Sequence, residues 1–234
     1  MSFSIIIPSK TPENASACVA SIIASQRGTP KEPGTPVRVV WDGDLIPFIA
    51  KPGNGVYVSL IPGVKPFVFA RNVNLGIDAA IAEGDDAVVI VNDDTTLLEP
   101  FGYSWLVRHA LDHPEFGVIS AGITQHVGNP EQLKLPGTRL RALKNSKTLA
   151  FVAVCITRKT LEQIGPLDER FTAYGWEDND YCLRCRQTGL KLGVFDGCVV
   201  EHGVLPSTFR AGNRAGDIEP GRKIFIEKWG SDSL

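Results

Sequence analysis

The sequence predicts an α/β fold with a mostly parallel, twisted sheet that is flanked by helices. In the N-terminal half, short apolar runs alternate with longer segments of helical spacing, which is the pattern of βαβ units with right-handed crossovers. The run Ala87–Val91 contains no polar residue, as is typical of a strand buried on both faces. A hydrophobic content of 43% in 234 residues is sufficient for a substantial core.

The N-terminal half is expected to supply the parallel strands. Pro8 follows the first β-rich run, and Gly84 stops the second helix, since glycine often follows the last helical turn. Strands are expected at 3–7, 37–41, 55–61 and 87–91, and helices at 13–25 and 69–82.

The C-terminal half contains two stretches without periodicity. Residues 125–148 are polar and carry a local positive charge, and 205–221 form an unusually long loop that suggests a lid or a mobile connection. Helices are expected at 101–113, 158–164, 176–187 and 222–229, and strands at 117–123, 149–157, 192–195 and 198–200.

Composition excludes several classes of protein. A net charge of -2 is inconsistent with a globally basic nucleic-acid binder. No segment has the length of a transmembrane helix, and the first residues lack the basic start of a signal peptide, so a cytoplasmic protein is expected. The five cysteines have no framework spacing, which predicts free thiols. The lone pair Cys182 and Cys185 does not predict a zinc site.

The most informative motif is Asn92-Asp93-Asp94-Thr95, directly after the buried run 87–91. Ligands of parallel sheets gather at the carboxyl ends of the strands. Two adjacent carboxylates and a hydroxyl at such an end suit a hard divalent cation. The alternative is a turn or a helix cap, because the same residue types favour both.

A second acidic cluster, 175–181, places carboxylates in the first turn of a predicted helix, where the helix dipole favours their ionised form. Asp180 and Arg184 are four apart and are expected to pair on the helix surface. Asp178 has no such partner, so it is either a cap or a general base. His202 follows a strand-like run. It is either a structural histidine whose hydrogen bonds are made within the protein or a residue that binds a ligand.

Five motifs follow one another along the chain. They are Ile5-Ile6-Ile7-Pro8, Val39-Val40-Trp41-Asp42, Ala70-Arg71-Asn72 with Gly76, Val91-Asn92-Asp93-Asp94-Thr95, and Gly175-Trp176-Glu177-Asp178-Asn179-Asp180 with Arg184. Taken in this order, they resemble the motifs of family 2 glycosyltransferases of GT-A fold. The segment 225–230 is also similar to the tails of rhamnosyltransferase-like members. Within this resemblance, Asn92 stands where the usual Asp-x-Asp motif has its first carboxylate, which leaves Asp94 as the main metal ligand.

The resemblance implies one GT-A domain over 1–234. Its nucleotide-binding half would span 1–98, a smaller acceptor-side half 99–204, and a lid loop with a C-terminal helix 205–234. The implied activity is metal-dependent transfer of a sugar, with inversion, from a nucleoside-diphosphate sugar to an acceptor hydroxyl. That acceptor is a glycan or, as in some viral members, a modified nucleic-acid base.

The resemblance also assigns roles to individual residues. Asp178 would be the catalytic base, and Asp94 with His202 would hold Mn²⁺ or Mg²⁺ against the diphosphate. Trp176 and Glu177 would border the acceptor. The donor would be bound by Pro8, Ser9, Asp42, Arg71, Asn72, Asn92 and Asp93.

Two other functions remain open at the level of sequence. A nucleotidyltransferase would also use a nucleotide and a cation, but the loop after the first strand, 8–12, contains no glycine. A non-catalytic nucleotide-sugar binding module would not need Asp178. Arg210 and Arg214 of the proposed lid would reach the diphosphate, and the basic residues within 134–147 would suit an anionic acceptor.

Overall fold

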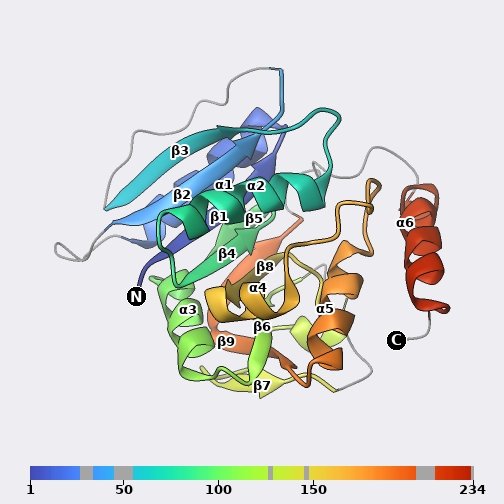
Figure 1. Ribbon diagram of the computed structural model, residues 1–234. Coiled ribbons are helices and arrows are strands. Elements are labelled where there is room, and N and C mark those ends of the chain that lie inside the picture. Colours follow the sequence, from blue (N-terminus) through green and yellow to red (C-terminus); the bar gives the residue numbers. More distant parts are fainter. Residues whose placement is uncertain (27–33, 45–54, 126–128, 145–147, 204–213, 233–234) are drawn as a thin grey trace.

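The structure is a computed structural model that describes residues 1–26, 34–44, 55–125, 129–144, 148–203 and 214–232. It confirms the predicted fold class: a central sheet is flanked by helices on both faces (Figure 1). The strand order is β3-β2-β1-β4-β8-β6-β9-β5, with β7 paired to β9. The strands are β1 Phe3–Ser9, β2 Thr35–Trp41, β3 Val56–Pro62, β4 Ala87–Val91, β5 Thr95–Leu97, β6 Phe116–Ile123, β7 Leu140–Ala142, β8 Ala153–Thr157 and β9 Lys191–His202.

The two halves of the sheet differ in strand direction. The strands β3, β2, β1 and β4 are mutually parallel, as the alternating sequence pattern predicts. Beyond β4 the sheet becomes mixed, because β8 runs antiparallel to both β4 and β6, while β6 and β9 are parallel. The carboxyl ends of β1, β2 and β4 therefore meet at one edge of the sheet.

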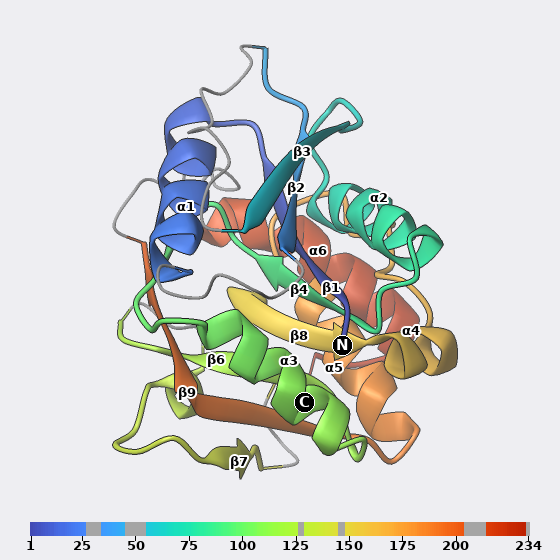
Figure 2. The same cartoon turned by 90° about the vertical axis from the view of Figure 1, so that its left-hand side faces the viewer.

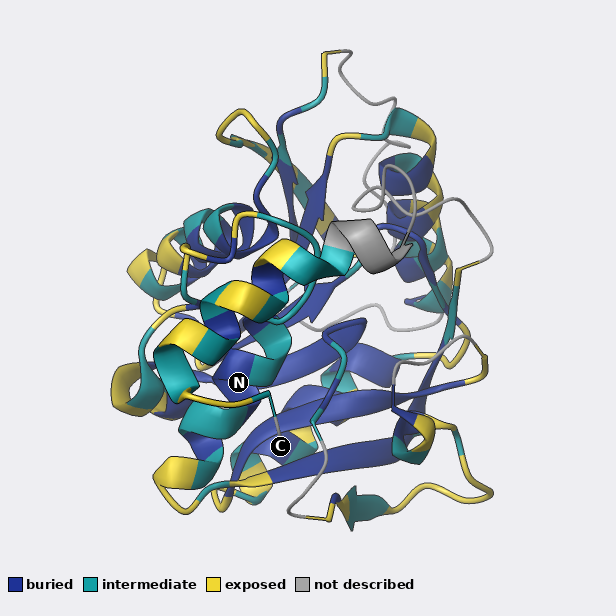
Figure 3. Cartoon of the chain, turned by 90° about the vertical axis from the view of Figure 1, so that its right-hand side faces the viewer, coloured by how far each residue is buried: buried dark blue, intermediate teal, exposed yellow. Residues whose placement is uncertain are grey.

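The helices cover both faces of the sheet. One core cluster packs α1 and α3 against the sheet, and a second packs α2, α4 and α5 against the opposite face (Figure 2). The C-terminal helix α6 lies outermost, at the surface of the molecule (Figure 3). The helices are α1 Pro12–Ser25, α2 Phe69–Ala82, α3 Gly102–Asp112, α4 Arg158–Ile164, α5 Glu177–Gln187 and α6 Arg214–Trp229, with a short 3-10 helix at Pro130–Gln132.

Several elements differ from the prediction. β7 lies in the stretch 125–148, for which the sequence predicted no strand. β9 is one continuous strand, Lys191–His202, although its pairing with β6 shifts register between Phe195 and Val199; His202 is its last residue. β5 was missed because three residues are too few for a periodic signal. α6 begins at Arg214 and not at 222, although Pro220 lies inside it. The predicted irregular stretch 205–221 is therefore helical from Arg214 onward.

The remainder of the predicted lid, including Arg210, lies outside the described residues. All five cysteines are buried and free, as predicted. Among the described helices, none combines the length and the apolar content that a membrane crossing needs.

Candidate active site

The carboxyl ends of β1 and β4 bring Ser9 and Asp93 together. Both side chains are buried, and Ser9 Oγ donates a hydrogen bond to Asp93 Oδ2. Pro8 is also buried, opposite Val40 in the β1–β2 pairing. Pro8 and Ser9 are part of β1, so the strand runs two residues beyond its predicted end. Asp93 is thus engaged with β1 and is not the carboxylate that faces β9.

Asn92 lies between the two halves of the sheet. Its backbone N–H donates to Val152 O at 2.8 Å, which ties the end of β4 to the segment that precedes β8. Its Oδ1 is buried and accepts no hydrogen bond from the described residues. A buried amide oxygen without a donor costs stability unless a ligand or water satisfies it.

Asp42, after β2, is held by Asn72 of α2. Asn72 Nδ2 lies 3.3 Å from Asp42 Oδ2, and Asn72 Oδ1 accepts a hydrogen bond from Val64 N at 3.2 Å. Burial raises the pKa of Asp42 above its ordinary value, and the Asn72 hydrogen bond partly offsets this. The two residues predicted to border a nucleotide are therefore in contact, and Asn72 orients Asp42 and the loop after β3.

A cavity of about 240 Å³ opens beside Asp42. Lys65 forms an ion pair with Asp44 at 2.5 Å, and Lys10 Nζ lies 5.6 Å from the centre of the Phe67 ring. The cavity is thus lined by both charge signs and by an aromatic face. Sequence reasoning missed Lys10, Lys65 and Phe67; the only available signal was their position after strand ends. The full lining is Lys10, Asp42, Gly43, Asp44, Lys65, Pro66 and Phe67.

Arg71 lies on α2 and is partly exposed, with 31% of its side chain accessible. Its Nε lies 3.6 Å from Glu169 Oε2, on the loop between α4 and α5. Arg71 therefore has a carboxylate partner on this loop. A donor phosphate at this position would compete with Glu169 for the guanidinium.

Asp94 and His202 meet across the short pairing of β5 with β9. Thr95 is opposite His202 in this antiparallel pair, and Gly203 N donates to Asp94 O at 3.2 Å. Asp94 Oδ1 is buried, accepts no hydrogen bond from the described residues, and lies 3.4 Å from His202 Nε2. The two predicted metal ligands are thus neighbours, although 108 residues separate them (202 − 94).

This pair fits a divalent cation. The unsatisfied carboxylate oxygen and the imidazole nitrogen are both metal-ligand atoms. Neighbouring ligands of an octahedral cation with bonds of about 2.1 Å lie roughly 3 Å apart, which is close to the observed 3.4 Å. In the part of the chain that the structure describes, no group of three or more His, Cys, Asp or Glu residues could hold a metal. The remaining ligands would come from substrate phosphates and water.

Asp178 lies in the first turn of α5, next to the segment that precedes β8. Burial raises the pKa of Asp178 to about 6, while hydrogen bonds from the backbone of Asn179 and Phe151 lower it. The Asn179 N–H lies 2.8 Å from Asp178 Oδ1. Phe151 adjoins Val152, whose carbonyl accepts the Asn92 N–H. One short segment therefore contacts both Asn92 and Asp178.

Glu177 and Trp176 immediately precede Asp178. Burial, and then the neighbouring Asp178 charge, raise the pKa of Glu177 well above its ordinary value. Glu177 Oε2 is buried and has no hydrogen-bond donor among the described residues. Trp176 has a left-handed backbone, with φ of 78°, and its ring centre lies 5.0 Å from that of Phe225 on α6. At least one face of Trp176 is therefore occupied by protein.

The basic stretch after β6 is partly engaged in internal contacts. Arg141 binds the fully buried Asp196 through two hydrogen bonds, of 2.7 and 3.0 Å. Lys134 Nζ donates to the carbonyl of Gly137 at 2.9 Å. Arg139 and Lys144 are exposed, and Lys147 lies outside the described residues. The local charge available to an anionic partner is thus smaller than the sequence suggests.

No protein-family model matches the chain, and no curated protein matches its sequence. Solved structures do match its fold. The crystal structure of GalNAc-T7 with UDP, GalNAc and Mn²⁺ aligns over 100% of the chain with a TM-score of 0.66 and 14% identity. The crystal structure of S. aureus TarS aligns over 99% with a TM-score of 0.63 and 16% identity. TarS 1-349 in complex with UDP-GlcNAc aligns over 99% with a TM-score of 0.59 and 16% identity.

The chain therefore has the GT-A fold. It spans 49% of the matched GalNAc-T7 chain and 40% of the matched TarS chain, and 68% of TarS 1-349.

Proposed function

We propose that this chain is a metal-dependent, inverting glycosyltransferase of the family 2 type, which transfers a hexosyl or deoxyhexosyl group from a nucleoside-diphosphate sugar. The observation that carries the proposal is the arrangement around the ends of β4 and β8. Asn92, two residues before Asp94, is bonded to Val152, and the adjacent Phe151 donates to Asp178. One segment of chain thus contacts both the candidate base and Asn92, which lies two residues before the candidate metal ligand Asp94.

Asp178 has the properties that a general base requires. With a pKa of about 6, most of its population is ionised at neutral pH, yet its basicity exceeds that of an ordinary aspartate. In the proposed reaction, Asp178 accepts the proton of the acceptor hydroxyl as that oxygen attacks the anomeric carbon. The bond from this carbon to the diphosphate oxygen breaks on the opposite side. A single displacement of this kind inverts the anomeric configuration.

The donor side is assigned to the strand ends. Asp94 and His202 would hold Mn²⁺ or Mg²⁺, which when bound offsets the negative charge of the departing diphosphate. Asp42 and the cavity beside it would receive the nucleoside. Neighbours with the same fold were crystallised with UDP and Mn²⁺ or with UDP-GlcNAc, which supports a uridine-type donor as the first to test.

The acceptor is proposed as a hydroxyl on a glycan or on a modified nucleic-acid base. The exposed Arg139 and Lys144 would tolerate an anionic acceptor. If the acceptor is a nucleic acid, its affinity should fall steeply with salt concentration. Affinity that does not change with salt would favour the uncharged glycan.

The direct test is release of nucleoside diphosphate from a panel of nucleotide sugars, with Mn²⁺, with Mg²⁺ and with EDTA. We expect release from at least one donor that depends on the cation and increases with a suitable acceptor. NMR of the product should show an anomeric configuration opposite to that of the donor. Release that EDTA does not affect would contradict the metal role, and retained configuration would contradict the single displacement.

A further inference from the structure

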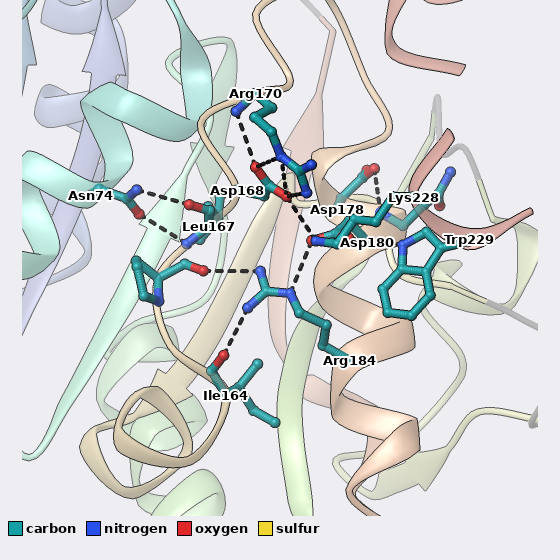
Figure 4. A network of polar contacts seen from close by, with 12 residues as sticks. Asn74, Ile164, Leu167, Asp168, Arg170, Asp178, Asp180, Arg184, Lys228 and Trp229 are labelled. Carbon is teal, nitrogen blue, oxygen red and sulfur yellow. Dashed lines mark hydrogen bonds and ion pairs between the residues drawn. The ribbon is translucent and has the colours of Figure 1, made fainter. Parts of the chain in front are cut away.

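The C-terminal helix α6 is joined to α5 and to the loop before it through charged side chains, of which Asp180 is fully buried (Figure 4). Lys228 Nζ lies 2.7 Å from Asp168 Oδ2 and 2.7 Å from Asp180 Oδ1. Trp229 Nε1 donates to the same Asp180 oxygen at 2.9 Å. Two consecutive residues near the end of the described chain thus converge on a carboxylate in the first turn of α5.

Asp180 is completely buried, and its second oxygen is also engaged. Arg184 Nε donates to Asp180 Oδ2 at 2.9 Å, while the same guanidinium donates to the carbonyls of Ile164 and Pro166. A buried carboxylate is tolerated only when such partners compensate its lost hydration. Removing the Lys228 cation would leave Asp168 and Asp180 without the charge that they share.

α6 also packs on the turn that precedes Asp178. Gly175 has φ of 84° and Trp176 has φ of 78°, a left-handed conformation that is unfavourable for a tryptophan and requires support from its surroundings. The Phe225 ring supplies that support against Trp176, with centres 5.0 Å apart. At Gly221 the helix approaches so closely that an added Cβ would lie 2.5 Å from Gly175 O.

The opposite side of the same loop is held by α2. Asn74 Nδ2 donates to Leu167 O and Asn74 Oδ1 accepts from Leu167 N, both at 3.0 Å. The loop that leads to α5 is therefore fixed from two directions, once by the donor-side half and once by α6 (Figure 4). Of these two sets of contacts, those of α6 are the ones that reach the left-handed turn and Asp180 in the first turn of α5.

We infer that Lys228 is a positioning residue, which through Asp180 holds the first turn of α5 so that Asp178 keeps its orientation toward the acceptor. The inference rests on the proposed function for the role of Asp178. The geometric basis is independent of it: Asp180 N donates to Trp176 O at 2.9 Å, so Asp180 and the left-handed turn belong to the same helical turn as Asp178.

The structural part is tested by hydrogen exchange of the intact protein without substrate. In Lys228→Met the amides of 176–181 should lose protection at least tenfold, because the clamp over this turn is removed. Lys223→Met is the matched control, since Lys223 is exposed on the same helix, and it should exchange like the wild type. If Lys228→Met does not fold, Trp229→Phe is measured in its place. This variant removes only the hydrogen bond to Asp180 and should show a smaller loss of protection at 176–181.

The catalytic part is tested by steady-state kinetics. Lys228→Met should lower kcat about tenfold or more with an unchanged KM for the donor, and Lys228→Arg should recover most of kcat. An equal loss of kcat in Lys223→Met, or unchanged exchange at 176–181 in Lys228→Met, would overturn the inference. If exchange changes as expected but the wild type transfers no sugar, the proposed function fails while the clamp over α5 stands.

Discussion

The donor-side and base-side regions of the candidate site are positioned in different ways. On the donor side, Ser9 ends β1, Asp42 follows β2 and Asp93 lies just after β4. Ser9 Oγ donates to Asp93, and the Asp42 N–H donates to Ser9 O at 3.3 Å across the sheet edge. On the base side, Asp178 follows a left-handed turn that is held by a helix from the end of the chain. The first arrangement follows from strand pairing, whereas the second depends on contacts between distant segments.

This contrast has a consequence for mutation. A change on the donor side should act mainly through a local hydrogen bond or a metal ligand, while the rest of the sheet keeps its register. A change on the base side should alter the orientation of one carboxylate, even when the altered residue is as remote in sequence as Lys228. Donor binding and the chemical step should therefore be separable.

The largest expected effect is that of Asp178→Asn. The amide cannot accept the proton, so kcat should fall about 10²- to 10⁴-fold, the usual contribution of a general base, while donor affinity stays unchanged. Calorimetry with the donor and NDP release measure the two quantities. Asp78→Asn, an exposed change on α2, is the matched control. Full activity in Asp178→Asn would favour a binding module or a different base.

The next effect is expected from His202→Ala, which removes one of the two candidate ligands. Half-maximal activation should require roughly 10- to 100-fold more Mn²⁺, comparable to other losses around metal sites, and donor affinity without metal should not change. A Mn²⁺ titration of activity measures this. His113→Ala, with 44% of its side chain exposed, should titrate like the wild type; an identical curve for His202→Ala would exclude it as a ligand.

The pH dependence should come from the base side. The pKa of Asp178 is raised from 3.8 to about 6, so the ionised base is lost as pH falls through about 6, and kcat should then decrease about tenfold per unit. Between pH 3.8 and about 6 the Asp178 carboxyl is ionised in the unfolded chain but still protonated in the folded protein. Folding stability therefore falls as the pH rises through this window, and the ionised carboxylate destabilises the fold at neutral pH. Asp178→Asn should therefore raise Tm at pH 7.5 and not at pH 3. A Tm gain of equal size at both pH values would contradict the raised pKa.

The smallest effect is expected for Ser9→Ala on the donor side. It removes a donor from the buried Asp93 carboxylate and should lower the free energy of unfolding by about 1–3 kcal/mol. Urea denaturation at pH 7.5 measures the change. Ser59→Ala, exposed on the edge strand β3, serves as control. Equal stability of the two variants would show that the Ser9–Asp93 bond contributes little.

The position of the residues at the end of β4 could be predicted from the sequence for a physical reason. A buried strand and the polar residues that end it are adjacent in the chain, so Asn92, Asp93 and Asp94 could be placed from local pattern alone. Local pattern alone does not show that Asn72 contacts Asp42 or that His202 contacts Asp94. Asn72 and His202 are assigned to the site only through the resemblance to family 2 glycosyltransferases. The contact between Asp94 and His202 depends on β5, whose three residues carry no periodic signal.

The base side shows where local pattern fails. Pro220 and the surrounding glycines predict a loop, yet 214–229 is helical, because packing of Phe225 and Trp229 outweighs the low propensity of its first turns. The pairing of Asp180 with Arg184 was visible from a spacing of four. Its bonds to Lys228 and Trp229 were not, since no local rule links residues almost fifty positions apart.

The most direct test of the account is a crystal structure of the protein with Mn²⁺ and a nucleoside diphosphate, with anomalous scattering used to locate the metal. We predict one Mn²⁺ bound by Asp94 Oδ1 and His202 Nε2 and by diphosphate oxygens, with Asp178 facing the bound diphosphate. Mn²⁺ bound elsewhere, or a diphosphate away from the ends of β1, β2 and β4, would contradict the proposed transferase.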